Sequence, residues 1–77
     1  MGGSNLQGYD VEANYMGDIP IRGHCLSSRT KWGGGVHHRV RLESGFIACE
    51  GKVVRRAGEV VFVEHSEITR LRDPSTL

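Results

Sequence analysis

The stretch that decides the fold is VHHRVRL, residues Val36–Leu42, in which apolar and cationic side chains alternate with a period of two. A β-strand directs successive side chains to opposite faces. One face of this strand would carry Val36, His38, Val40 and Leu42, and the other would carry His37, Arg39 and Arg41. The pattern therefore predicts a strand with an apolar inner face and a cationic outer face.

The length of the chain sets the scale of the molecule. Seventy-seven residues form at most one domain, and so small a domain often gains stability by association. No apolar run reaches the roughly 20 residues that span a bilayer, and the first residues lack the pattern of a signal peptide. We expect one cytoplasmic domain that assembles as a homo-oligomer and has no membrane partner.

Charge is distributed unevenly along the chain, although the net charge is only +1. Residues 1–19 carry three acidic side chains and no Lys or Arg, whereas residues 20–56 carry eight Lys and Arg against two Glu. The remainder, residues 57–77, is again net acidic. A basic middle segment of this kind attracts polyanions locally.

Turn residues and apolar runs divide the chain into short segments. Residues 1–17 are rich in Gly and Asn and predict a flexible acidic arm; the alternative is an arm that adds an edge strand to a neighbour. The domain itself is expected over residues 18–73, followed by a tail at 74–77. Strands are expected at 19–28, 36–42, 46–56, 60–63 and 68–71, with Gly51 marking a bulge or bend and residues 64–67 forming one turn of 3₁₀ helix.

Five short strands with close turns predict an all-β fold. An antiparallel, strongly bent sheet of this size protects its edges best by closing into a small barrel. We therefore expect a five-stranded barrel of the SH3-like or Sm-like kind, with an OB-like barrel as the alternative.

The last part of the domain resembles a known family. Val60–Val63, a four-residue turn and Ile68–Leu71 are similar to the close of SH3-like and Sm-like barrels, whose fourth and fifth strands are joined by a 3₁₀ turn. Val63, Glu64 and His65, followed by a Ser and an Ile, resemble the second Sm signature of the bacterial RNA chaperone Hfq. That resemblance implies a ring-forming barrel that binds RNA. Glu64 replaces the family's lysine, so only His65 carries over.

Two groups of residues are candidates for binding nucleic acid. The first is a basic strand face on which guanidinium groups would neutralise phosphates; it comprises Arg22, His24, His37, Arg39, Arg41 and Arg55. The second is the Gly-rich loop at residues 29–35, where Trp32 would stack on a base with Arg29 and Lys31 beside it. Each has an ordinary structural alternative: cross-strand pairing of the arginines with Glu43 or Glu50, and packing of Trp32 over one end of the barrel.

Metal and catalytic chemistry find little support. Cys25 and Cys49 lie in apolar-alternating stretches and are expected to be buried free thiols. The His and Cys residues lack the spacing of zinc sites, and no Cys–His pair has a third group to orient it. We expect no enzyme activity, no metal and no cofactor.

These observations favour a nucleic-acid-binding small barrel, specific for RNA or single-stranded DNA because it lacks a recognition helix. The second hypothesis is a protein-interaction module or small inhibitor that acts through its N-terminal arm or an exposed strand edge. A third is a small-ligand site at a subunit interface, lined by Trp32 and His38.

Overall fold

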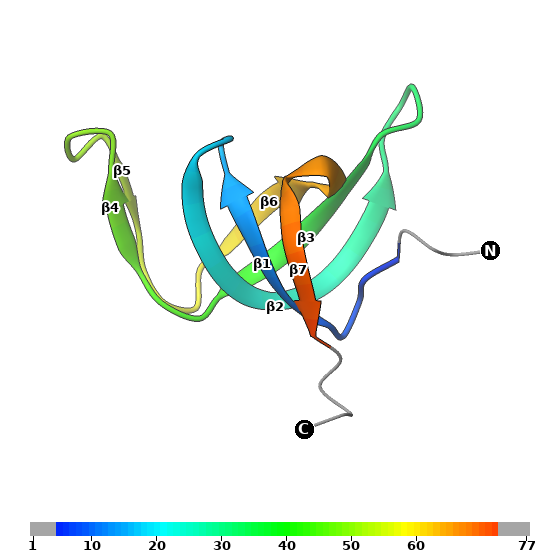
Figure 1. Ribbon diagram of the computed structural model, residues 1–77, viewed down its shortest axis with the longest axis horizontal. Coiled ribbons are helices and arrows are strands. Elements are labelled where there is room, and N and C mark those ends of the chain that lie inside the picture. Colours follow the sequence, from blue (N-terminus) through cyan, green and yellow to red (C-terminus); the bar gives the residue numbers. More distant parts are fainter. Residues whose placement is uncertain (1–4, 73–77) are drawn as a thin grey trace.

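The computed structural model describes residues 5–72, which form an all-β fold with one short 3₁₀ turn (Figure 1). Five strands make an antiparallel sheet in the order β6-β3-β2-β1-β7. Their bounds are β1 Asp10–Tyr15, β2 Ile19–Thr30, β3 Val36–Leu42, β6 Val60–Glu64 and β7 Ile68–Arg72. The turn η1 (His65–Glu67) joins β6 to β7, and a separate hairpin consists of β4 (Phe46–Ala48) and β5 (Val53–Arg55).

The predicted all-β, antiparallel architecture is confirmed, and closure of the barrel is not. The strands expected near residues 19, 36, 60 and 68 are present, as is the 3₁₀ turn between the last two. Over the described residues the sheet ends at β6 on one side and at β7 on the other, with no pairing between them. The described part of the chain is therefore a bent but open sheet.

Strand β2 provides the bend that connects the two halves of the sheet. It pairs with β1 through its first half and with β3 through its second half, and Gly23 pairs with both neighbours. A Cβ at Gly23 would collide with the carbonyl oxygen of Arg41 and lie 2.6 Å from a methyl group of Val40. The absence of a side chain at this position lets β3 approach closely while β2 curves across it (Figure 1).

The expectation of a mobile arm over residues 1–17 is wrong for the part that forms β1. This strand lies inside the sheet, between β2 and β7, and its residues Val11 and Ala13 are almost fully buried. Leu6, just before it, is also buried. The domain therefore begins well before residue 18, because β1 pairs with a strand on each side and buries its few small apolar side chains. Residues 1–4 and the predicted tail at 74–77 lie outside the described residues.

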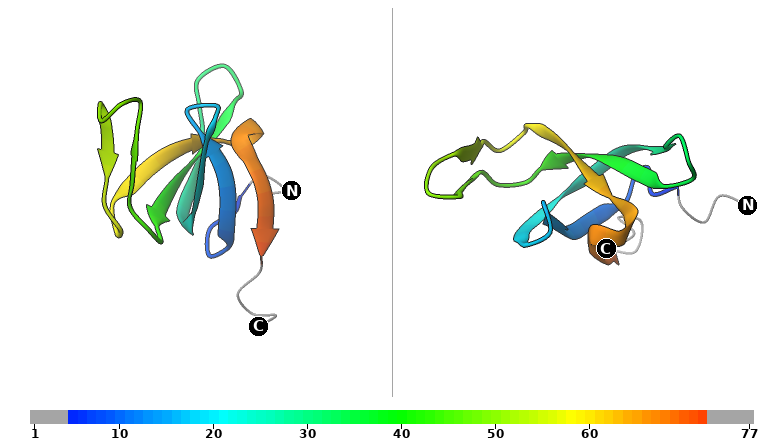
Figure 2. Two further views of the ribbon diagram at one scale, coloured as in Figure 1. Left: turned by 60° about the vertical axis from the view of Figure 1, so that its left-hand side comes forward. Right: turned by 90° about the horizontal axis from the view of Figure 1, so that it is seen from above.

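The long strand expected at residues 46–56 is instead the β4–β5 hairpin. Phe46 pairs with Arg55 and Ala48 with Val53, and the connecting turn contains three successive positive φ values at residues 49–51. Gly51 thus belongs to a reversal of the chain and not to a bulge within a strand. The hairpin projects from the end of the five-stranded sheet (Figure 2).

The core is aliphatic and lies on the inner face of the sheet. Its buried apolar side chains are Leu6, Val11, Ala13, Ile21, Cys25, Val40, Leu42, Val61 and Val63. His38 is fully buried among them. The inner face predicted for residues 36–42 is confirmed, since the side chains at 38, 40 and 42 are buried and those at 39 and 41 are exposed.

Candidate nucleic-acid interface

The outer surface of strands β2, β3 and β6 carries most of the cationic side chains singled out in the sequence; we call it the outer face. The strand register arranges it in three rows. From β2 through β3 to β6 these rows are His24, Arg41 and Val60; Ser27, Arg39 and Phe62; and Arg29, His37 and Glu64.

An irregularity in β2 brings two of these residues to the outer face. Cys25 pairs with Val40, but the next residue in register with β3 is Ser27, so Leu26 is an extra residue of the kind that makes a β-bulge. The bulge reverses the side-chain alternation beyond it. Ser27 and Arg29 therefore join the outer face, while the intervening Ser28 turns inward.

The centre of the outer face is an aromatic pair beside a hollow. The rings of His37 and Phe62 lie 5.3 Å apart between centroids, at an interplanar angle of 46°. Phe62 is 59% exposed. A hollow of about 340 Å³ adjoins this pair and is lined by Ser27, Arg29, His37, Arg39 and Phe62. A planar ligand group could therefore contact both an aromatic ring and cationic side chains here.

Two acidic side chains of β1 pair with basic side chains in the first half of β2. Glu12 lies 3.5 Å from the Arg22 guanidinium, and Asp10 lies 3.0 Å from Nδ1 of His24. By contrast, Arg29, Arg39 and Arg41 form no ion pair with any of residues 5–72. The outer face thus keeps three cations whose charge is not neutralised by a neighbouring carboxylate.

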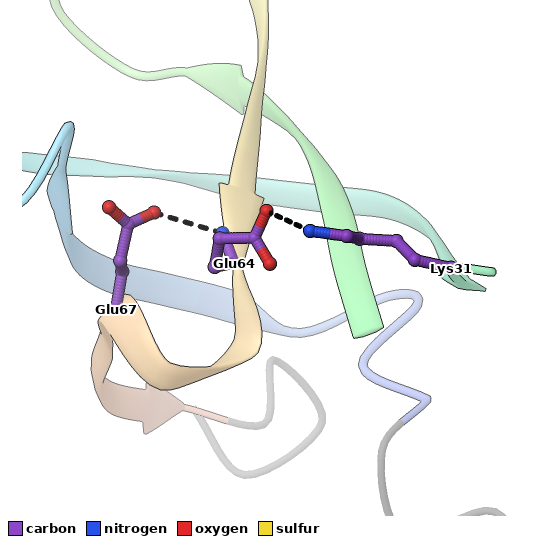
Figure 3. A network of polar contacts seen from close by, with 3 residues as sticks. All are labelled: Lys31, Glu64 and Glu67. Carbon is purple, nitrogen blue, oxygen red and sulfur yellow. Dashed lines mark hydrogen bonds and ion pairs between the residues drawn. The ribbon is translucent and has the colours of Figure 1, made fainter. Parts of the chain in front are cut away.

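Lys31 and Glu64 form the third ion pair, at the end of β6. Nζ of Lys31 donates to Oε2 of Glu64 at 2.7 Å, and the backbone N–H of Glu64 donates to Oε1 of Glu67 at 2.9 Å (Figure 3). The hydrogen bond from Lys31 lowers the pKa of the Glu64 carboxyl. Glu64 therefore stays ionised and paired. Lys31 is for this reason not one of the unpaired cations of the outer face.

The other predicted binding residues lie apart from the hollow. Trp32 is fully exposed at the tip of the β2–β3 loop and does not cover an end of the sheet. Arg55 lies on the β4–β5 hairpin, where its guanidinium donates to the hydroxyl of Tyr15 at 3.4 Å. His65 begins the η1 turn, and its Nδ1 lies 3.0 Å from Nε2 of His38.

Phe62 and Ser27 are the residues of the hollow that the sequence did not single out. Phe62 belongs to the run Val60–Val63, which is apolar throughout and suggested a strand buried on both faces. In the structure β6 is an edge strand whose side chains alternate, so Val61 and Val63 are buried and Phe62 is exposed. An apolar residue on the outer side of an edge strand would have indicated an exposed apolar site. The sequence alone does not show which strand lies at the edge, so this signal could not be used.

A chain of polar contacts runs through the core beneath the outer face. Ser28 Oγ lies 2.6 Å from Nδ1 of His38, whose Nε2 faces His65, and Ser28 Oγ also accepts the backbone N–H of Leu6 at 3.0 Å. Burial lowers the pKa of His38, and the nearby His65 and His37 lower it further. Because His38 is fully buried, it does not line a ligand site. Its contacts tie the first described residues to β2, β3 and η1.

The two cysteines differ in their surroundings. Cys25 is buried as predicted, and desolvation raises the pKa of its thiol. Cys49 is exposed in the β4–β5 turn, so the prediction that it is buried is wrong. Within residues 5–72, no three His, Cys, Asp or Glu side chains gather in a way that would hold a metal ion.

Comparisons with known proteins assign no family to this chain. No protein-family model, curated protein or solved structure matches it significantly. A helix of the length and apolarity needed to cross a bilayer does not occur in the described part of the chain.

Proposed function

We propose that this protein binds single-stranded nucleic acid, RNA or DNA, through the outer face. The observation that carries the proposal is the aromatic pair of half-buried His37 and exposed Phe62, flanked by cations that no carboxylate of residues 5–72 neutralises. Proteins that bind single strands combine such a positive surface with aromatic platforms on which bases stack. In this site Phe62 stacks on a base while Arg29 and Arg41 contact phosphates on either side.

The preference for single strands follows from access to the base. A stacking side chain needs a base whose flat face is free, and such bases occur in unpaired strands. One large class of duplex readers inserts a recognition helix into the major groove, and the described residues contain no α-helix. Trp32, at the tip of the β2–β3 loop, is a further stacking residue of this proposal.

We also propose the finer fold assignment, an SH3-like or Sm-like domain. The strand order and the 3₁₀ turn between β6 and β7 support it. The two sheet edges, β6 and β7, are the surfaces through which copies would associate, and a cytoplasmic homo-oligomer remains a prediction. His65 has a smaller role in this proposal because its Nδ1 already faces His38.

Fluorescence anisotropy with a labelled single-stranded oligonucleotide tests the function. Phe62→Ala should weaken binding by about 5- to 150-fold, because stacking on one base contributes roughly 1–3 kcal/mol. Ile47→Ala is the matched control, since Ile47 is an exposed apolar residue on the β4–β5 hairpin. If the two variants bind equally well, or if the unmodified protein binds no strand, the proposal is wrong.

A protein-interaction module is the second candidate function. Its supporting observation is the cross-strand pair of Ile47 and Val54 on the projecting hairpin, which are 73% and 49% exposed. Exposed apolar pairs of this kind suit contact with another protein. Since β1 lies inside the sheet, this hairpin takes the place of the N-terminal arm in that hypothesis.

A further inference from the structure

We propose that the hollow beside Phe62 is a pocket for one base that selects guanine over adenine. The inference rests on the proposed function and adds a ligand preference to it. The volume of the hollow, about 340 Å³, is near the lower end of the range of ligand pockets, roughly 300–1,000 Å³. This size suits a single planar group better than an extended ligand.

The register of the sheet decides which side chain meets the edge of the base. Arg39 is the direct cross-strand neighbour of Phe62, and both line the hollow. A base stacked on the Phe62 ring would therefore present one edge to the Arg39 guanidinium. Arg29 and His37 form the next row of the outer face and complete that side of the hollow.

The polar groups around the hollow are mainly hydrogen-bond donors. The guanidinium groups of Arg29 and Arg39 carry N–H donors and no acceptor. Among the side chains that line it, only the hydroxyl of Ser27 and one nitrogen of a neutral His37 can accept a hydrogen bond. No carboxylate of residues 5–72 lines the hollow, and the nearest acid in the register, Glu64, is held by Lys31.

This set of donors matches guanine better than adenine. Guanine presents two adjacent acceptors, O6 and N7, to which an arginine binds with both arms of its guanidinium. Adenine presents N7 beside an amino group, and that amino group would face a second donor. On the edges that a duplex exposes in the major groove, cytosine offers only an amino group and uracil offers one acceptor at O4, although unpaired cytosine also exposes N3 and O2 on its Watson–Crick edge. Of the two purines, guanine is thus the one that satisfies Arg39 fully.

A series of oligonucleotides that differ at one base tests the inference. The probe is a labelled oligouridine of about eight nucleotides, within the usual site size of small single-strand binders, with one central base exchanged. Guanine and hypoxanthine, which both keep O6 and N7, should bind about 5- to 150-fold more tightly than adenine. 7-Deazaguanine, which lacks N7, should fall between them.

Two conservative variants separate base recognition from charge. Arg39→Lys keeps the charge but loses the planar fork, so it should lower the preference for guanine over adenine while the strand still binds. Arg56→Lys is the control, because Arg56 is exposed, follows β5 and does not line the hollow. It should retain the preference, and an equal loss in both variants would overturn the assignment to the hollow.

The outcomes distinguish failure of this inference from failure of the proposed function. Salt-sensitive binding with equal affinity for the guanine and adenine probes would refute the guanine pocket and leave strand binding intact. Absence of binding to every probe would refute strand binding. If free GMP but not AMP then shifts the NMR signals of His37 and Phe62, which line the hollow, the pocket would stand as a site for a free guanine nucleotide; no shift with either nucleotide would refute both.

Discussion

Replacing Arg41 by Ala should reduce the salt dependence of strand binding. When a cationic side chain neutralises a phosphate, counterions are released, and each such contact adds about −0.7 to the slope of log K against log salt concentration for single strands. The proposed phosphate contacts are those of Arg29 and Arg41, both exposed and free of ion pairs within residues 5–72. The expected slope is therefore about −1.4 for the unmodified protein and about −0.7 for Arg41→Ala.

These slopes translate into affinities that can be measured directly. A fourfold rise in salt should weaken binding about sevenfold in the unmodified protein and about threefold in Arg41→Ala. Fluorescence anisotropy at four or more salt concentrations gives the slope of each variant. Phe62→Ala should bind more weakly at every concentration with an unchanged slope, because base stacking releases no counterions.

Lys52→Ala controls for the loss of one positive charge from the molecule as a whole. Lys52 is exposed and precedes β5 on the projecting hairpin, away from the outer face (Figure 2). Its removal changes the net charge as much as Arg41→Ala does and should leave the slope unchanged. Equal slopes in the unmodified protein and Arg41→Ala, or an equal reduction in both variants, would refute the assignment of Arg41 to a phosphate contact.

Two further predictions concern the stability of the fold. Gly23→Ala should lower the free energy of unfolding by about 1–3 kcal/mol through overpacking against Val40 and the backbone of Arg41. Gly35→Ala is the control and should not lower it, because the new Cβ would meet nothing closer than 3.8 Å. Urea denaturation of both variants gives the comparison. Because the pKa of buried His38 is lowered, the unfolded chain binds more protons than the folded one below about pH 6.5. The urea midpoint should therefore fall as pH is lowered from about 7 towards 5, and a midpoint that rises over this range would contradict the burial of a neutral His38.

Side-chain alternation made β3 predictable, and the course of β2 and the presence of β1 less so. The alternation over Val36–Leu42 correctly predicts that His38, Val40 and Leu42 are buried and that Arg39 and Arg41 are exposed, because a regular strand allows only two assignments and a buried core selects one. The bulge at Leu26 has no such signature, yet it decides that Arg29 faces outward. Strand β1 was missed because its apolar positions, Val11 and Ala13, are few and small, and its place in the sheet depends on pairing with β7, 55 to 62 residues further along the chain.

The candidate site shows the same division between local and long-range information. His37, Arg39 and Arg41 follow from one strand, and their shared face was predictable from residues that are neighbours in sequence. The residues that line the hollow together with His37 and Arg39 come from other strands: Phe62 from β6 and Ser27 from β2. Ion pairing also reduces the number of cations that are free to bind phosphate, since Arg22 and Lys31 each pair with a carboxylate. Neither the lining of the hollow nor these ion pairs can be predicted from the sequence of a single segment.

The exposure of Phe62 is the feature that the fold itself does not require. Strand β6 is anchored by Val61 and Val63 on the inner face, so its outer positions could be filled by any side chain that favours strands, including polar ones such as threonine. An exposed aromatic residue on an edge strand adds a risk of association with other chains. Meanwhile the core contains no fully buried Phe, Tyr or Trp among residues 5–72, although a small domain would gain stability from burying one. An exposed Phe ring outside this core, next to His37 and two arginines that form no ion pair within residues 5–72, therefore supports the proposal that a ligand stacks on it.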